Sequence, residues 1–78
     1  QQSIFSNVMV YPNPTNGKIS INIKGYLGIP RIKVFDLSGR LLQSSNSNFI
    51  NIKKYSDGIY ILKVSYADIT EEIRVVKK

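Results

Sequence analysis

The sequence contains no cysteine, no histidine and no tryptophan. Without cysteine, disulfides and thiolate zinc sites are excluded, so a domain of this size depends on its hydrophobic core. The loss of histidine as well as cysteine removes the usual general base, the usual metal ligands and the most reactive nucleophile. Serines are present, but no base is available to activate one. We therefore expect no enzymatic activity and no cofactor or metal.

Long apolar runs and blocks of one charge sign are also missing. No stretch approaches the ~18 apolar residues that a membrane span needs, so we expect no transmembrane segment. The formal net charge is +6, but the cations are spread along the chain and alternate with apolar residues, as on solvated strand faces. Tyrosines interleaved with lysines can stack bases in other proteins. At least Tyr60 is expected to be structural, so no nucleic-acid partner is expected, and the chain is expected to be a monomer.

What is present is a series of short alternating segments typical of β-strands. The clearest is 18–24, where Ile19, Ile21 and Ile23 face one way and polar residues face the other. Further strands are expected at 8–11, 32–35, 40–42, 49–52, 59–66 and 69–78. About seven short strands with frequent turns predict an all-β, immunoglobulin-like sandwich of two antiparallel sheets, with a small barrel as the alternative. The predicted core comprises Ile19, Ile21, Val34, Ile50, Tyr60, Leu62, Val64 and Val75.

The hairpin over 32–42 is expected in the middle of a sheet. Asp36 at the first turn position can bond the backbone two residues on, and Gly39 accepts the positive φ that the turn requires. The polar segment 43–48 that follows (QSSNSN) predicts a mobile loop.

Two further turns are predicted. The prolines of Pro12-Asn13-Pro14 fix φ and remove two backbone donors, and the Asn16-Gly17 pair favours a turn. This corner is expected to lead the chain from one sheet to the other. The second turn is 55–58, with Asp57 as its cap. Gly58-Ile-Tyr60 resembles the tyrosine corner of immunoglobulin-like sandwiches, in which the hydroxyl bonds to upstream backbone.

Four segments carry a resemblance to a known family. They are VYPNPTNGKISI (10–21), VFDLSGRLL (34–42), YSDGIYILKV (55–64) and IRVVKK (73–78). In this order they resemble the C-terminal sorting domain of the type IX (Por) secretion system, type A. Residues 8–78 are then expected to form the sorting domain, and 1–7 the end of a linker from an upstream cargo protein. The matching motif positions are Pro12, Asn13, Pro14, Gly17, Asp36, Gly39, Gly58 and Tyr60.

The resemblance implies a role as an address in Gram-negative bacteria. It implies that the domain directs its cargo from the periplasm across the outer membrane, to the cell surface or the medium. The implied partners are outer-membrane translocon components and a sortase-like cysteine protease that removes the domain. Most motif residues also have turn or packing roles, so the residues expected to contact a partner are Arg40, Arg74, Lys77 and Lys78. Arg74 departs from the family, whose last strand often has lysine there.

Two alternatives remain open. The chain could be a carbohydrate-binding or fibronectin-like adhesion module of a secreted protein, with Tyr26 and Tyr66 as exposed aromatics on a sugar site. Asp68, Glu71 and Glu72 cluster around the last turn and could form a weak calcium site with backbone carbonyls, although a solvated turn is the favoured interpretation.

Overall fold

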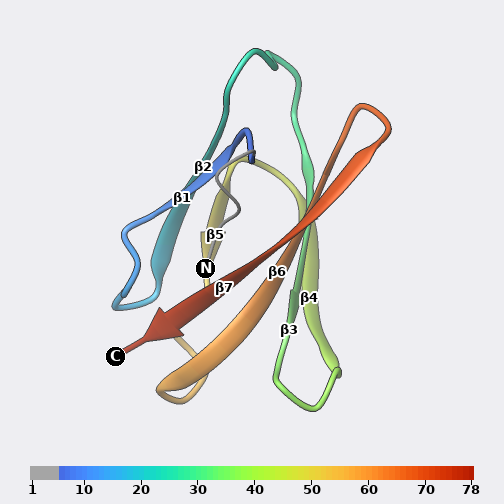
Figure 1. Ribbon diagram of the computed structural model, residues 1–78. Coiled ribbons are helices and arrows are strands. Elements are labelled where there is room, and N and C mark those ends of the chain that lie inside the picture. The colour runs from blue at the N-terminus through green and yellow to red at the C-terminus, as the bar shows by residue number, and fades with distance from the viewer. Residues whose placement is uncertain (1–5) are drawn as a thin grey trace.

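Seven antiparallel strands form two facing sheets in the computed structural model, which describes residues 6–78 (Figure 1). The smaller sheet has the order β1-β2-β5, made of β1 (Val8–Tyr11), β2 (Lys18–Ile23) and β5 (Phe49–Asn51). The larger sheet has the order β4-β3-β6-β7, made of β3 (Arg31–Phe35), β4 (Leu41–Asn46), β6 (Gly58–Tyr66) and β7 (Ile69–Lys77). The predicted all-β sandwich is confirmed.

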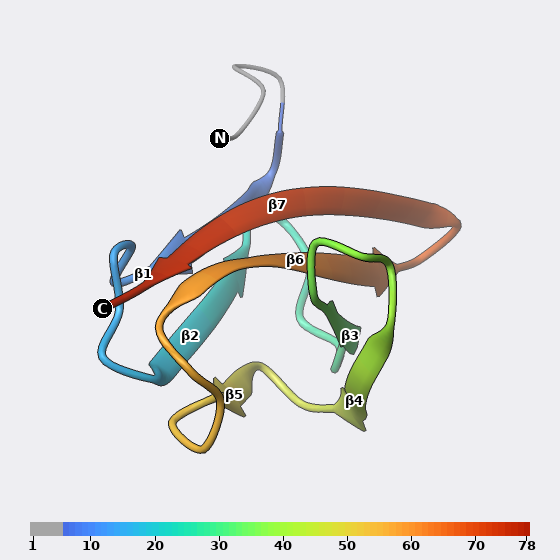
Figure 2. The same cartoon turned by 90° about the horizontal axis from the view of Figure 1, so that it is seen from below.

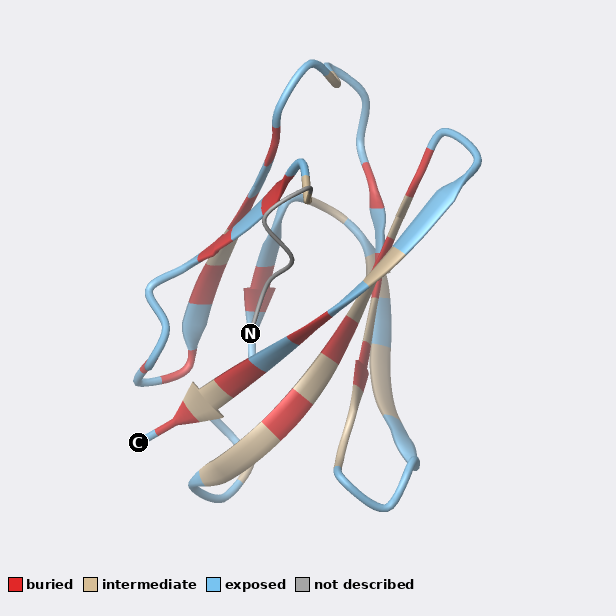
Figure 3. Cartoon of the chain, viewed as in Figure 1, coloured by how far each residue is buried: buried red, intermediate tan, exposed pale blue. Residues whose placement is uncertain are grey.

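The core lies between the two sheets and is built from the inward positions of nearly every strand (Figure 3). Every residue of the predicted core is buried, and Ile32, Ile52 and Ile73 join it. β-branched side chains suit this packing because they are stiff and stand well on a pleated surface. Each fully buried isoleucine or valine contributes about 1.5–3 kcal/mol.

The larger sheet is organised around β3 and β6. The β3–β4 hairpin closes through hydrogen bonds from Asp36 N to Arg40 O (3.1 Å) and from Gly39 N to Asp36 O (3.0 Å), with Gly39 at a φ of 91°. The predicted turn is therefore confirmed. Only β3 has the expected central place, because β4 lies at the edge of the sheet.

The structure corrects two predictions. Residues 43–46 are part of β4, with Ser45 in register with Ile32, rather than a mobile loop. Because an edge strand needs few apolar side chains, its backbone pairing leaves little trace in the hydrophobic pattern. The corner at Pro12–Pro14 joins β1 to β2 within one sheet, instead of leading from one sheet to the other.

The first described residues are bonded to the domain. Asn7 O accepts a hydrogen bond from Lys24 N (2.9 Å), and the Ser6 hydroxyl donates to the Glu71 carboxylate. Of the linker expected over 1–7, residues 1–5 lie outside the described residues. Within 6–78, no helix has the length and apolar character needed to cross a membrane.

Candidate recognition surface

The turns of the first three motif segments and the end of the fourth gather at one end of the sandwich, the lower end in Figure 1. This end, which we call the motif end, comprises residues 12–18, 36–40, 52–57 and 76–78. In the view from below, the connections β1–β2, β3–β4 and β5–β6 face the viewer, and the end of β7 lies beside the first of them (Figure 2). The fold thus brings together segments that are far apart in the sequence.

Hydrogen bonds hold the proline corner against the end of β7. Thr15 N donates to Val76 O (2.8 Å), and Lys78 N donates to Thr15 O (2.9 Å). The Asn13 side chain donates through Nδ2 to Arg74 O (3.0 Å) and accepts from Val76 N at Oδ1 (3.0 Å). The Asn13 amide therefore replaces a neighbouring strand along this part of the β7 edge. The first and last motif segments are physically joined.

Thr15 and Gly17 shape the corner itself. The Thr15 hydroxyl donates to Lys18 O (2.7 Å) and accepts from Gly17 N (3.0 Å), and the residue is 3% exposed. A Cβ on Gly17 would lie 2.7 Å from Lys53 Cα, so the close approach of two backbones requires glycine there. Sequence reasoning missed Thr15. The signal in the sequence was a hydroxyl two residues before Gly17, because a threonine at this spacing can accept a hydrogen bond from the glycine N–H and so form a turn.

Asp36 organises the second motif turn, as predicted. One carboxylate oxygen accepts from Ser38 N (3.0 Å), the Ser38 hydroxyl (2.6 Å) and Arg40 N (3.0 Å). The other oxygen lies 3.2 Å from Arg40 Nε. The hydrogen bond from the Ser38 hydroxyl, followed by that from the Arg40 backbone, lowers the pKa of Asp36. The Arg40 side chain is 75% exposed, so its charge remains open to solvent beside this turn.

Tyr60 anchors the third motif segment. Its hydroxyl donates to Ser56 O, as expected for a tyrosine corner, and its ring is buried. The Tyr55 ring lies 5.9 Å from it, and the Tyr55 hydroxyl donates to Gln43 Oε1 (2.8 Å). These contacts tie the 55–58 turn to β4. Gly58 begins β6 in register with Lys77.

Lys77 has a structural role that the sequence analysis did not anticipate. It is 8% exposed, and its Nζ lies 3.0 Å from Asp57 Oδ1. The expectation that Lys77 has no role in the fold is therefore wrong, and Asp57 pairs with it instead of capping its own turn. The reason is the alternation of β7, which places Lys77 on the inward face after Ile73 and Val75.

The remaining predicted contact residues are exposed but occupy two regions. Arg40 and Lys78 lie at the motif end, whereas Arg74 projects from β7 in register with Ile61 of β6. The motif end is strongly cationic. Its carboxylates, Asp36 and Asp57, are both ion-paired. Its cations outnumber them and are Lys18, Arg40, Lys53, Lys54, Lys77 and Lys78.

The aromatic pair proposed for a sugar site is not available. Tyr66 is 6% exposed and its hydroxyl donates to Glu71, while the Tyr26 ring packs against it with centroids 5.5 Å apart. With Tyr66 buried and Tyr26 half-buried against it, the two rings do not form an exposed platform for a sugar. This removes the observation on which the adhesion alternative depended.

The acidic cluster at the last turn does not converge on one point. Glu71 bonds Ser6 and Tyr66, and Glu72 lies 3.7 Å from Lys63 Nζ. Burial raises the pKa of Glu71, but hydrogen bonds from Ser6, Tyr66 and the Asn7 backbone outweigh it and lower the pKa overall. In the described part of the chain, no group of three or more acidic or other metal-binding side chains could hold an ion.

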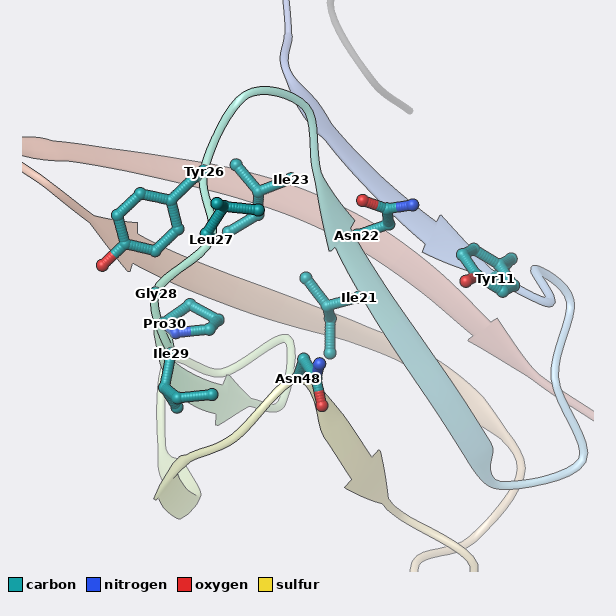
Figure 4. Close-up of a pocket in the computed structure, with 10 residues that line it drawn as sticks. All are labelled: Tyr11, Ile21, Asn22, Ile23, Tyr26, Leu27, Gly28, Ile29, Pro30 and Asn48. Carbon is teal, nitrogen blue, oxygen red and sulfur yellow. The ribbon is translucent and has the colours of Figure 1, made fainter.

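A hollow of about 380 Å³ lies between β2 and the 25–30 connection (Figure 4). Tyr11, Leu27 and Ile29 are its exposed apolar side chains, and Asn22 and Asn48 are its side-chain amides. It is lined by none of the predicted motif or contact residues. No carboxylate or cation lines it, so its polar lining consists of neutral groups.

The chain matches the model of a known protein family. A family model described as "Secretion system C-terminal sorting domain" matches residues 9–78. No curated protein matches the chain. The matched range contains all four motif segments and therefore the whole motif end.

Proposed function

The chain belongs to the family of secretion system C-terminal sorting domains, and we propose that the type IX translocon reads its folded motif end as an address. Members of this family are non-catalytic tails, and such a tail marks the protein that carries it as secreted or displayed at the cell surface. We further propose that residues 8–78 are the sorting domain and 1–7 the end of a linker. The cargo upstream would pass through the periplasm, and a sortase-like protease would then cut in the linker.

The join between the proline corner and β7 is the observation that carries this proposal. Asn13 and Thr15 bond backbone groups of Arg74, Val76 and Lys78 from the other end of the chain. A surface made in this way exists only after both sheets have formed and packed. It therefore suits a receptor that must accept a folded domain and ignore an unfolded chain.

Charge supports the choice of contact residues at this end. Arg40 and Lys78 are exposed, beside the exposed lysines 18, 53 and 54. An acidic receptor surface would be steered to such a patch over about one Debye length, ~8–10 Å. Lys77 would contribute indirectly, because its pairing with Asp57 holds the end of β7 in place.

A reporter fusion tests the proposal. The domain is fused to the C-terminus of a periplasmic reporter in a host with a type IX system, and exported reporter is measured. We expect export of the intact fusion, and we expect Lys78→Glu to lower export while reporter accumulates in the periplasm. Lys24→Glu is the matched control, because Lys24 is an exposed lysine that follows β2 at the opposite end. Absence of export for the intact fusion would refute the proposal.

A point variant is preferred to deletion of the last two residues. Deletion would remove the hydrogen bond from Lys78 N to Thr15 O and the ion pair between Lys77 and Asp57. It would therefore weaken the fold as well as the charge. Lys78→Glu keeps the backbone bond, and a melting curve equal to that of the parent confirms that only the charge has changed.

A further inference from the structure

The outer face of the larger sheet carries a row of side chains that crosses all four strands. Leu41 is in register with Phe35, Phe35 with Ile61, and Ile61 with Arg74. We call these four residues the outer row. Successive residues of a strand point to opposite faces of the sheet. Phe35 and Ile61 are next to the core residues Val34 and Leu62 in sequence, so the outer row projects away from the smaller sheet. Within residues 6–78, no strand or loop covers this face (Figures 1 and 2).

This face is more apolar than a solvated sheet face requires. On β2 the outward residues are polar, as expected when one side of an antiparallel sheet meets water. On β6 the outward positions Ile59 and Ile61 are apolar, and they are only partly buried by their neighbours. Leu37 in the adjoining turn is 64% exposed. A contiguous apolar patch of this kind marks an interaction site more often than chance exposure does.

The surface is hollowed on both sides of Ile61. One hollow of about 220 Å³ is lined by residues that include Phe35, Leu37 and Lys63, and it reaches the 36–39 turn of the motif end. A second hollow of about 220 Å³ is lined by Ile73 and Arg74, and Glu72 lines both hollows. Ile61 borders both hollows. The hollow beside Phe35 provides room for an apolar side chain of a partner, whereas the hollow lined by Glu72 and Arg74 suits a polar one.

Charged groups surround the apolar centre and favour a partner with carboxylates. Lys63 Nζ lies 4.8 Å from the centroid of the Phe35 ring and 3.7 Å from Glu72 Oε2, so Glu72 is already partnered. Among residues 6–78, Arg74 forms no ion pair, and Lys33 adds a second cation in the neighbouring row. Arginine beside an apolar centre is a frequent source of binding energy.

We propose that the outer row docks a protein component of the translocon, through an apolar side chain that enters the hollow beside Phe35 and a carboxylate that pairs with Arg74 at the other hollow. This inference rests on the proposed function and identifies a second surface for it, which adjoins the motif end at the 36–39 turn. A second copy of this chain is a poor occupant. Each copy carries a net charge of +6, and a symmetric pairing of this face would bring two uncompensated cationic rims together.

Export of the reporter fusion tests the outer row with two variants and two matched controls. Ile61→Thr keeps β-branching but removes apolar surface, and Arg74→Glu reverses the charge without touching the core. The controls are Phe49→Thr, an exposed apolar residue on the smaller sheet, and Lys24→Glu. We expect each outer-row variant to lower export by about tenfold, as truncation of a central interface residue does. The controls should export normally.

Melting curves separate loss of docking from loss of folding. If Ile61→Thr unfolds, Arg74→Glu alone decides, because its side chain is exposed. Normal export of folded Arg74→Glu overturns the inference but leaves the proposed function intact, whereas absence of export for the intact fusion refutes the proposed function itself.

Photo-crosslinking identifies the occupant. Benzoylphenylalanine in place of Leu41, the exposed outer-row residue on β4, should form an adduct with an outer-membrane component of the secretion system during export. The same analogue in place of Leu27, which is fully exposed on the 25–30 connection, is the control and should not form that adduct. An adduct with a second copy or with lipid, or no adduct at position 41, overturns the inference.

Discussion

Replacing Thr15 with valine tests whether the proline corner is held by its buried hydroxyl. Valine keeps the volume and the β-branch and removes only the hydrogen-bonding oxygen. Two backbone groups then lose their partner: Gly17 N–H, which lies 3.0 Å from the hydroxyl, and Lys18 C=O, which lies 2.7 Å from it. Each buried polar group left unpaired costs about 1–3 kcal/mol.

The expected total is about 2–3 kcal/mol, because the Lys18 carbonyl is only partly buried and can find water. Small domains have about 5–15 kcal/mol of stability, so the loss is a large fraction for this chain. For a domain of this size 1 kcal/mol corresponds to about 4–8 °C, so the melting temperature should fall by roughly 10–20 °C.

Thermal melting followed by circular dichroism measures this change, and urea unfolding gives the free energy directly. The matched control is Thr70→Val on β7, whose hydroxyl shares an exposed 3.0 Å hydrogen bond with Ser65. Because water replaces that bond, the control should change stability by less than about 0.5 kcal/mol. Equal melting temperatures for the two variants would show that the hydroxyl of Thr15 does not hold the corner.

Three further predictions concern the turns and the N-terminal attachment. Gly39 has a φ of 91° and open space where a Cβ would lie, so Gly39→Val should cost about 1–3 kcal/mol of backbone strain, and Gly39→Asn less; an unchanged melting curve would contradict this. The pKa of Asp36 is lowered mainly by Ser38, so its stabilisation is complete above about pH 4 and lost as the pH falls through the folded pKa. Urea midpoints of Asp36→Asn should therefore depend less on pH in the acidic range than those of the parent, and parallel curves would refute the assignment. Glu71→Gln should speed amide hydrogen exchange at the start of β1, because the carboxylate anchors Ser6; identical exchange in parent and variant would argue against this anchor.

Local chemistry explains why most strands and turns could be predicted. Alternating isoleucines at 19, 21 and 23 admit only one pleated arrangement with a buried face, and β2 spans them. The Asp36 turn and the Tyr60 corner depend on partners within four residues. Such short-range preferences are present in the sequence itself and survive folding unchanged.

The continuation of β4 over 43–46 was not predicted, because the stability of this part comes from outside its own segment. Gln43 to Asn46 has no apolar alternation, and its backbone is ordered by pairing with β3 and by the contact between Tyr55 and Gln43. The structural role of Lys77 was not predicted, for a related reason. A terminal lysine is usually solvated, and only the register of β7 turns it inward to Asp57.

The sequence by itself determined the all-β class, the positions of the main turns, the core residues and the family resemblance, because these depend on local pattern and composition. Only the tertiary structure decided what those elements touch. The Asn13 side chain bonds backbone that lies 61 and 63 residues away, and Ile61 shares one uncovered row with Phe35 and Arg74. Such contacts follow from which strands pair and in what register. The free energy that selects that pairing comes from burial across the whole sandwich, and no short segment contains it.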